Sequence, residues 1–477
     1  MSQLKLSKEG WSNQTLFILA AVGSAVGLGN IWKFPYITGE NGGGAFVLVY
    51  LACVLLIGIP VLLSEIALGR AGKANPVQAM ATLAHENRAS RLWFLLGLNG
   101  VLAGALILSF YTVIAGWGVS YFIESLQGAF IGITAEQVGV HFTGLLANPY
   151  ELLFWHTVVT LVTVYIVSKG VKSGLERAIS FMMPGLLVIL LVLLGYATTT
   201  GAFGQSFSFL FSPDFTKLSW EAVLVAMGHA FFTLSIGLGT MMVYGSYLSE
   251  KYSIVKAGLW IAAADTIVAL LAGLIIFSIV FANGLEPGSG PGLLFQTLPI
   301  AFGQMTGGWF FGTLFFALVI MAALSSSISL IEPAVSWFDQ NWGIKRVKAA
   351  WILGFLIWTI GIGTVLSFNE WADVHFLGER TFFDSLDYIT ANIMLPLGGL
   401  LMAVFVAWVL TPEHRQQEID LSPGLMKWFV LDLKWLAPVA ILVVFASNLV
   451  DSESVILMIA IALAVYAVYV WNSVRNS

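Results

Sequence analysis

Two apolar segments of the chain carry closely spaced glycines beside polar side chains. The stretch GSAVGLGNIWKFP at residues 23–35 and the stretch FFTLSIGLGT at residues 231–240 each contain a Gly-Leu-Gly triplet. An interrupted helix exposes amides that attract anions at one half-helix end and carbonyls that attract cations at the other. A zwitterion could therefore be held between the two breaks. The glycines alone could also serve close helix packing.

A third stretch offers oxygen ligands inside an apolar helix. In MAALSSSISLIEP, residues 321–333, Ser325 and Ser326 follow the carbonyl of Ala322 by one helical turn. Three oxygens at this spacing suit a small hard cation such as sodium. The alternative is that these hydroxyls bond back to their own helix, as serine in an apolar helix commonly does.

Lipid is the solvent around these stretches. Of the 477 residues, 58% are hydrophobic and 10% are charged, and the mean hydropathy is +0.89, outside the range of soluble globular proteins. The lipid bilayer is therefore an expected partner, while the net charge of -5 gives no reason to expect nucleic acid. The only cysteine, Cys53, excludes an internal disulfide. Nothing in the sequence requires an oligomer.

Apolar runs of about 20 residues predict an all-α polytopic membrane protein with about twelve transmembrane helices. The first follows a polar N-terminus without a small-residue cleavage site, so we expect an uncleaved span rather than a signal peptide. The predicted spans are 14–38, 44–69, 92–126, 151–168, 177–200, 220–248, 256–283, 307–339, 348–368, 383–410, 428–449 and 454–473.

The positively charged residues predict the orientation of these spans. Most Lys and Arg residues fall in alternate loops, which are therefore expected on the cytoplasmic side of a bacterial cell membrane, together with both termini. The loops 127–150 and 285–306 contain no Lys or Arg, and the second is predicted to be a folded outer loop with a short helix.

The two glycine breaks lie five spans apart, on the first and the sixth span. Paired interruptions at corresponding positions of two halves indicate an inverted-repeat transporter whose substrate binds near the midplane. We therefore predict one domain, 1–477, with discontinuous helices 1 and 6, a 5+5 inverted repeat of about 14–200 and 220–410, and peripheral helices at about 428–473.

Four motifs together resemble the neurotransmitter:sodium symporter family, and in particular its bacterial amino-acid transporters, which include the leucine transporter and the multi-hydrophobic amino-acid transporter. The similarity covers nearly the whole chain. It rests on AVGLGNIWKFPY with ENGGGAF after it, GIPVLLSEIALGR on the second span, FFTLSIGLGT on the sixth and LSSSISL on the eighth. The resemblance implies sodium-coupled uptake by alternating access.

The resemblance also implies ligands for two sodium ions. The first ion would be held by the substrate carboxylate with Ala25, Asn30, Thr233 and Asp265. The second would be held by main-chain carbonyls and two hydroxyls, from Gly23, Val26, Ala322, Ser325 and Ser326.

The amino-acid site implied by the resemblance lies between the two breaks. The substrate carboxylate would meet amides of the first break and the hydroxyl of Tyr111, and the ammonium would meet carbonyls of both breaks and the hydroxyl of Ser235. The implied substrate-binding residues are Ser24, Ala25, Leu28, Gly29, Ile107, Tyr111, Phe232, Thr233, Ser235, Leu238, Gly239, Ser326, Ser329 and Leu330.

Two positions narrow the substrate class. Relatives that carry monoamines place an aspartate where this chain has Gly27, so the substrate here is expected to bring its own carboxylate. Leu238 stands where the leucine transporter has phenylalanine, which leaves room for an aromatic side chain. We predict a hydrophobic L-amino acid, aromatic or branched.

The resemblance places gates on both sides of this site. Lys33 and Asp387 resemble the outer charged pair, although Lys33 replaces the usual arginine and could instead be a lysine extending from a helix end to the interface. Lys8, Trp11 and Tyr247 resemble the inner latch. The usual inner aspartate is missing: its position holds Gln340, with Asp339 before it, and Glu332 has no assigned role.

Four further residues have expected roles. Glu65 is expected to satisfy amides freed by the break, and Gly174 with Pro184 marks the part of the fifth span that unwinds in this family. Asp265 is expected to supply the negative charge that chloride supplies in some relatives, because the leucine transporter's glutamate position holds Ala269. Transport should then be independent of chloride. Asp265 could alternatively be neutral and only hydrogen-bonded.

Other functions remain possible from the sequence. A nontransporting amino-acid sensor with the same fold, or a symporter for another small zwitterion, fits the same motifs. A channel would need a continuous polar pathway, whereas the polar groups cluster at one depth. An enzyme is not expected, since the six histidines are scattered and none pairs at metal-ligand spacing.

Overall fold

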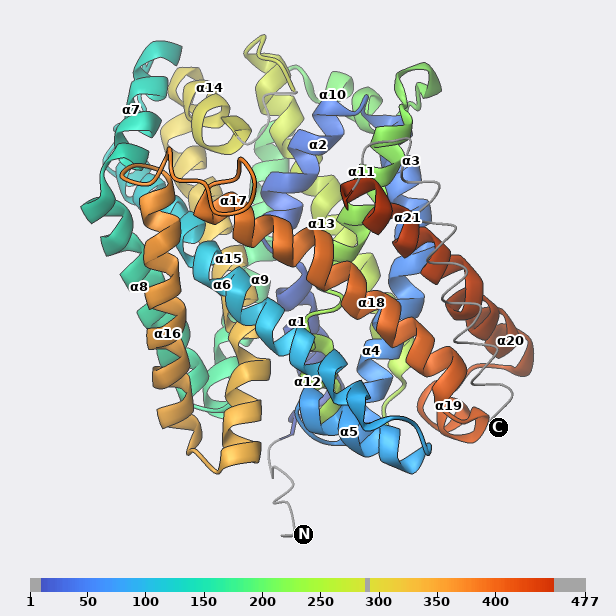
Figure 1. Ribbon diagram of the computed structural model, residues 1–477. Helices are drawn as coiled ribbons and strands as arrows, with labels where there is room; N and C mark the ends of the chain where they lie inside the picture. The colour runs from blue at the N-terminus through green and yellow to red at the C-terminus, as the bar shows by residue number, and fades with distance from the viewer. Residues whose placement is uncertain (1–9, 288–291, 450–477) are drawn as a thin grey trace.

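The computed structural model describes residues 10–287 and 292–449, which form a bundle of long helices (Figure 1). Nine continuous helices in the described part are long and apolar enough to cross a membrane, or ten if the bent first pair counts as one span. The sixth predicted span is present as two shorter helices. The twelfth, 454–473, lies outside the described residues. The predicted all-α polytopic fold with discontinuous helices is confirmed.

The first half of the bundle begins with a broken span. Helix α1 (Gln14–Ala25) ends at the glycine-rich stretch, and a π-helical turn at Gly29–Lys33 leads into α2 (Phe34–Glu40), bent by 50° from the first part. The remaining long helices of this half are α3 (Gly44–Cys53) running into α4 (Ile59–Gly72), α6 (Phe94–Leu126), α8 (Pro149–Ser168) and α9 (Arg177–Thr198).

The second half repeats the arrangement. Helices α11 (Trp220–Thr233) and α12 (Thr240–Ser246) are separated by a non-helical stretch, as the first span is. The helices that follow are α13 (Ile254–Ala282), α15 (Gly308–Trp342), α16 (Arg346–Ser367), α17 (Phe382–Asp387) continuing into α18 (Leu395–Val404), and α20 (Pro423–Leu431) continuing into α21 (Ala437–Leu449).

Short helices in the loops distinguish the two ends of the bundle. One end carries α5 (Pro76–Glu86) and α19 (Pro412–Glu418), and the other carries α7 (Ala135–Ala147), α10 (Phe203–Phe211) and α14 (Leu298–Gln304) (Figure 1). We call them the inner and the outer end, following the basic loops. Helix α14 confirms the short helix predicted in the loop 285–306.

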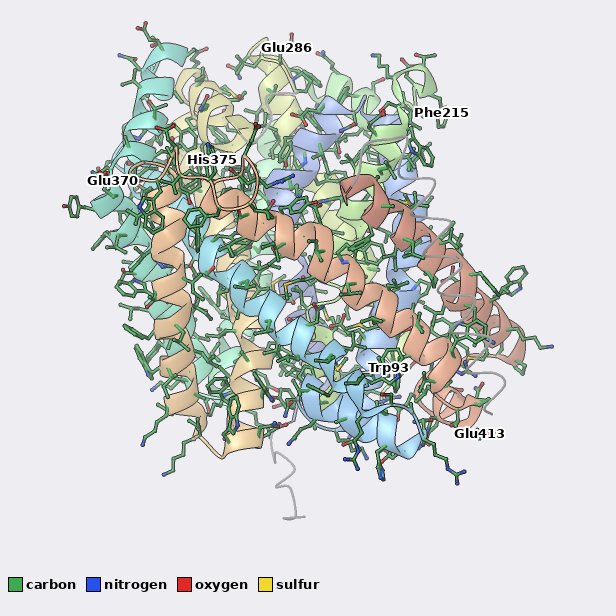
Figure 2. The ribbon with its side chains drawn as sticks, in the orientation of Figure 1. Trp93, Phe215, Glu286, Glu370, His375 and Glu413 are labelled. Carbon is green, nitrogen blue, oxygen red and sulfur yellow. The ribbon has the colours of Figure 1, made fainter. Side chains whose placement is uncertain are left out.

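Charged side chains gather at both ends of the bundle. Glu286 and Glu370 lie toward the outer end and Glu413 at the inner end (Figure 2). On the outer side, Glu124 accepts a hydrogen bond from His141 of α7 at 2.5 Å, and this bond raises the pKa of His141. The contact ties the outer helix α7 to α6.

The fifth span departs from its predicted start. Hydropathy placed it at Arg177, but a π-helical turn at Val171–Glu176 already belongs to the helix. A π-helical turn is a local weak point of a helix. It contains Gly174, where a side chain would collide with the carbonyl of Ile166. The glycine therefore permits the close approach of this turn to α8.

Candidate functional site

At the break in the first span, a side chain satisfies a backbone N–H group that a continuous helix would satisfy with a main-chain carbonyl. Val26 adopts an extended conformation, φ −71° and ψ 104°, so α1 cannot continue through it. The amide oxygen of Asn30 accepts a hydrogen bond of 3.0 Å from the N–H of Gly27. Asn30 is fully buried. Its side chain thus satisfies a backbone group for which lipid offers no partner.

The break in the sixth span contains strained backbone. Gly237 and Gly239 have φ of 88° and 71°, which glycine adopts without cost. Ser235 has φ of 53°, a conformation that side chains other than glycine rarely adopt. Glu65 accepts a hydrogen bond of 2.9 Å from the N–H of Gly237, which is the role predicted for it. No sequence pattern indicates the strain at Ser235.

The side chains implied for the first sodium ion lie together. The amide nitrogen of Asn30 donates to Thr233 at 3.1 Å and to the Asp265 carboxylate at 2.7 Å. Thr233 donates to the other carboxylate oxygen of Asp265 at 2.9 Å. Thr233 is 1% exposed and Asp265 is fully buried. The Asp265 carboxylate and the Thr233 hydroxyl are oxygen ligands of the kind that suits a hard cation.

The groups implied for the second ion meet where α1 passes α15. The Ser326 hydroxyl lies 3.4 Å from the Val26 carbonyl, and Ser325 donates to the Ala322 carbonyl at 3.0 Å. A side chain at Gly23 would lie 3.3 Å from Ser325 and 3.0 Å from the sulfur of Met183. Met183 precedes Pro184 in α9. The weakened fifth span therefore covers these oxygens.

Between the breaks lies a central cavity of about 40 Å³. Most of the implied substrate-binding residues line it, and Thr233, Gly239 and Ser329 do not. The Ser329 hydroxyl instead bonds to the hydroxyl of Tyr244 at 2.8 Å and to the Ser325 carbonyl at 3.0 Å. The lining residues are Ser24, Ala25, Gly27, Leu28, Gly29, Ile107, Tyr111, Phe232, Ser235, Leu238, Ser326, Leu330 and Leu395.

Both breaks contribute polar groups to the lining of the cavity. The hydroxyl oxygen of Tyr111 accepts from the N–H of Leu28 at 3.3 Å. Ser235 donates to the Ser24 carbonyl at 2.9 Å. A side chain at Gly27 would lie 2.5 Å from the Ser326 hydroxyl and 3.0 Å from the Tyr111 hydroxyl. The rest of the lining is mostly apolar, so the cavity combines a few polar groups with apolar side chains.

A larger cavity of about 370 Å³ lies on the outer side of this one and shares Leu28, Tyr111 and Phe232 with its lining. Lys33 and Asp387 both line the outer cavity but, in the described structure, form no ion pair with each other. The Lys33 ammonium lies over the ring of Phe232, 4.6 Å from its centroid. The charged pair of Lys33 and Asp387 therefore stays a prediction.

The inner side is closed by residues next to the first helix. The indole N–H of Trp11 donates to the carbonyl of Tyr244 at 2.9 Å. Ser12 donates its backbone N–H and its hydroxyl to the two oxygens of Glu176, both at 2.7 Å. Glu176 belongs to the π-helical turn of the fifth span. Lys8, also predicted for this latch, lies outside the described residues.

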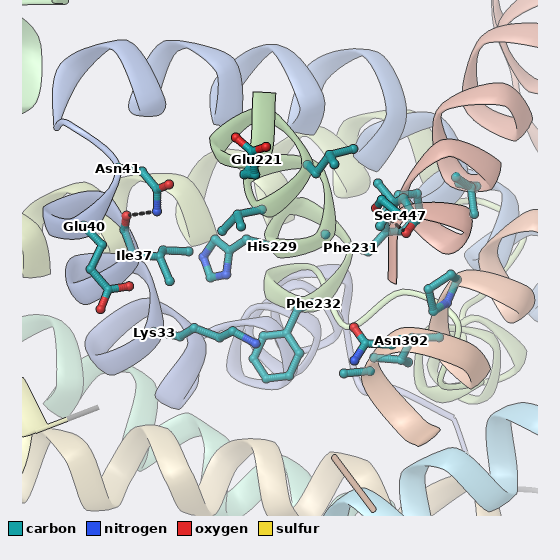
Figure 3. Close-up of a pocket in the computed structure, with 18 of the residues that line it drawn as sticks. Lys33, Ile37, Glu40, Asn41, Glu221, His229, Phe231, Phe232, Asn392 and Ser447 are labelled. Carbon is teal, nitrogen blue, oxygen red and sulfur yellow. Dashed lines mark hydrogen bonds between the residues drawn. The ribbon is translucent and has the colours of Figure 1, made fainter. Parts of the chain in front are cut away.

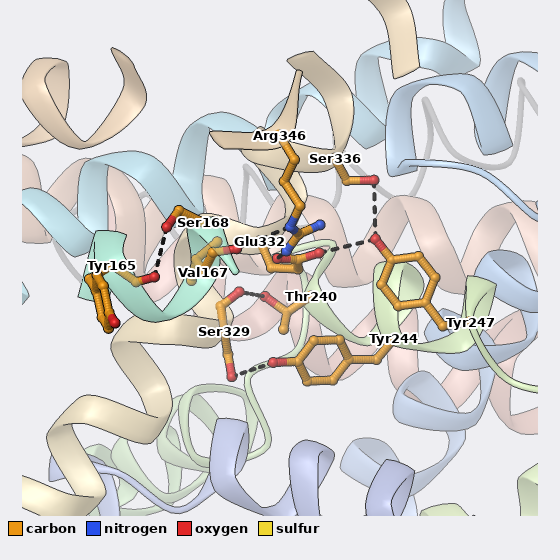
Figure 4. A network of polar contacts seen from close by, with 10 residues as sticks. All are labelled: Tyr165, Val167, Ser168, Thr240, Tyr244, Tyr247, Ser329, Glu332, Ser336 and Arg346. Carbon is orange, nitrogen blue, oxygen red and sulfur yellow. Dashed lines mark hydrogen bonds and ion pairs between the residues drawn. The ribbon is translucent and has the colours of Figure 1, made fainter. Parts of the chain in front are cut away.

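A buried ion pair completes the inner closure (Figure 4). Arg346 pairs with Glu332, which is fully buried, and donates to the carbonyl of Val167 at 3.0 Å. The hydroxyl of Tyr247 donates to Glu332 at 3.0 Å. Gln340 instead accepts from the backbone N–H of Asn75 at 2.7 Å. Glu332, which has no role in the sequence prediction, is therefore the carboxylate of a buried ion pair at this end.

Comparison with known proteins agrees with this geometry. The model of the family described as the sodium:neurotransmitter symporter family matches residues 8–138 and 130–460. The uncharacterized sodium-dependent transporter YhdH of Bacillus subtilis is 38% identical, over 91% of this chain and 96% of that protein. An uncharacterized sodium-dependent transporter of Haemophilus influenzae is 34% identical, over 93% of this chain and 98% of its own length.

A solved structure shares the fold at higher identity. The crystal structure of MhsT in complex with L-phenylalanine aligns with a TM-score of 0.86 and 43% sequence identity, covering 93% of this chain and 100% of that one.

Proposed function

This chain belongs to the sodium:neurotransmitter symporter family and is a sodium-dependent symporter, and from this premise we propose that it takes up hydrophobic L-amino acids, aromatic or branched. Two sodium ions accompany the substrate, and no chloride is needed. The outer cavity and the closed inner side correspond to the outward-facing state of an alternating-access cycle.

The observation that carries this proposal is the central cavity around Gly27. The position that holds an aspartate in monoamine carriers has no side chain, and the Ser326 and Tyr111 hydroxyls occupy the space beside it. The cavity therefore offers no carboxylate to an amine. An amino acid supplies its own carboxylate, which can meet the amide of Leu28, the Tyr111 hydroxyl and the first sodium ion.

The rest of the cavity supports an apolar side chain. Ile107, Leu238 and Leu330 line it, and each is less than a tenth exposed. A pocket of this kind favours a hydrophobic group through removal of apolar surface from water, about 25 cal/mol per Å². The relative solved with L-phenylalanine supports the same substrate class for this chain.

We expect uptake to require sodium. In proteoliposomes with an inward sodium gradient, a labelled hydrophobic amino acid should accumulate, and an inside-negative potential should increase the rate. Each sodium ion gains about 2.3 kcal/mol from a potential of about 100 mV. Uptake that is unchanged when choline replaces sodium would contradict the coupling. Sodium-dependent binding without accumulation would identify a nontransporting sensor instead.

Leu238→Phe should narrow the pocket and weaken binding of tryptophan more than binding of leucine. Leu238 is 4% exposed and lines the central cavity, and overpacking a defined cavity typically costs about 1 to 3 kcal/mol. Competition binding of both amino acids measures the difference. Ile267→Phe is a suitable control because Ile267 is exposed on the surface of α13. An equal loss for tryptophan and leucine would show that Leu238 does not contact the substrate side chain.

A further inference from the structure

Leu395 separates the central cavity from a second, lateral one. The lateral cavity has a volume of about 490 Å³ and lies beside the outer halves of the broken helices, where His229, Phe231 and Phe232 face it (Figure 3). Among the described residues, only Phe232 and Leu395 line both cavities. Leu395 is 3% exposed. The two cavities are therefore adjacent, and these two side chains contribute to both linings.

The backbone of Leu395 is held from two sides. The side-chain amide of Asn99 on α6 donates to the carbonyl of Met394 at 2.9 Å. A side chain at Gly237 would lie 2.6 Å from the Leu395 carbonyl oxygen, so the start of α18 packs directly against the break in the sixth span. Because the main chain is fixed there, the size of the side chain at 395 decides how far the central cavity extends.

The two shared wall residues differ in one respect. Phe232 also lines the outer cavity, so its substitution would change access from outside as well as the pocket. Leu395 does not line the outer cavity. Its substitution therefore changes the pocket while the outer opening keeps its lining.

We infer that Leu395 is a specificity-determining residue of the amino-acid site and sets the longest substrate side chain that the site accepts. The inference rests on the proposed function. A cavity of about 40 Å³ has room for about three water molecules, so a long side chain needs one wall to give way. Beyond Leu395 the lateral cavity continues with apolar residues, among them Leu224, Ile441 and Val444. Truncation at 395 would join this space to the pocket.

The test compares a normal with an extended substrate. Purified transporter in detergent with sodium binds the labelled amino acid that the wild type takes up, and unlabelled L-phenylalanine or para-phenyl-L-phenylalanine competes. In Leu395→Ala, the affinity for the extended compound relative to phenylalanine should rise at least tenfold. Leu395→Val, which removes one methylene group, should shift the ratio in the same direction by less. Val444→Ala is the matched control, because Val444 lines only the lateral cavity, and should leave the ratio unchanged.

The outcomes separate this inference from the proposed function. If phenylalanine binds and the affinity ratio of the two compounds is the same in wild type and in Leu395→Ala, the role of Leu395 is overturned. The proposed function is not affected by that result. If Leu395→Ala does not fold, an unchanged ratio in Leu395→Val has the same meaning. An equal rise in Val444→Ala would also overturn it. A wild type that binds no hydrophobic amino acid in sodium would overturn the proposed function, and this inference with it.

Discussion

Asp265→Asn should convert transport from chloride-independent to chloride-dependent. The Asp265 carboxylate is fully buried and takes hydrogen bonds from Asn30 and Thr233, both implied as ligands of the first sodium ion. A cation in a dry site needs a nearby negative charge. Asparagine keeps the shape of the side chain and removes the charge, so a diffusible anion must replace it.

The expected result is a loss of uptake of at least tenfold in gluconate and recovery in chloride. Uptake is measured in proteoliposomes with chloride or gluconate on both sides, for wild type and variant. Asp339→Asn is a matched control, because Asp339 lies near the inner end of α15 and contributes no atom to the sodium ligands implied by the sequence. Loss of wild-type transport in gluconate would contradict the proposal that Asp265 replaces chloride. A variant that transports equally well in gluconate and in chloride would show that Asp265 is not the anion substitute.

Arg346→Gln should destabilise the transporter strongly. The substitution removes the charged partner of Glu332, which is fully buried beneath the inner surface. Breaking a buried ion pair typically costs about 3 to 5 kcal/mol, because the remaining charge is left without compensation. The apparent melting temperature in detergent with sodium should therefore fall. Glu332→Gln in the same chain should restore most of the loss, since no buried charge then remains.

The exposed pair Lys73–Glu250 provides the control for this comparison. Its side chains are 55% and 61% exposed, and exposed pairs contribute about 0 to 1 kcal/mol. Lys73→Gln should leave the melting temperature nearly unchanged. Suppose that Arg346→Gln alone and Arg346→Gln combined with Glu332→Gln have the same melting temperature. The unpaired charge of Glu332 would then not be the cause of the destabilisation.

The spans could be predicted because lipid requires long apolar helices, and the breaks because glycine and asparagine stand out within them. Loop helices such as α5 and α7 are too short and too polar for a search based on hydropathy. The π-helical turn at Val171–Glu176 has no pattern of its own, and Lys172 within it resembled a loop residue. The start of the fifth span was therefore misplaced.

The parts of the candidate site that lie in sequence motifs could be predicted. The parts that depend on packing between helices could not. Asn30, Thr233 and Asp265 come together as the resemblance implied. The partner of Glu332 is Arg346, which lies on the next helix. Residue spacing within a single helix could therefore not predict this ion pair. Leu395 belongs to no motif and reaches the cavity only because α18 packs against Gly237. Ser329 points away from the cavity because Tyr244 engages its hydroxyl.

The close contacts around Gly27 also constrain how substrate preference can evolve. Any side chain there would meet the Ser326 hydroxyl at 2.5 Å, so an aspartate can enter only if that hydroxyl moves. The same hydroxyl lies 3.4 Å from the Val26 carbonyl, in the group of oxygens implied for the second sodium ion. A change of substrate class at position 27 therefore also disturbs a group proposed to bind sodium, so the two properties are coupled in evolution.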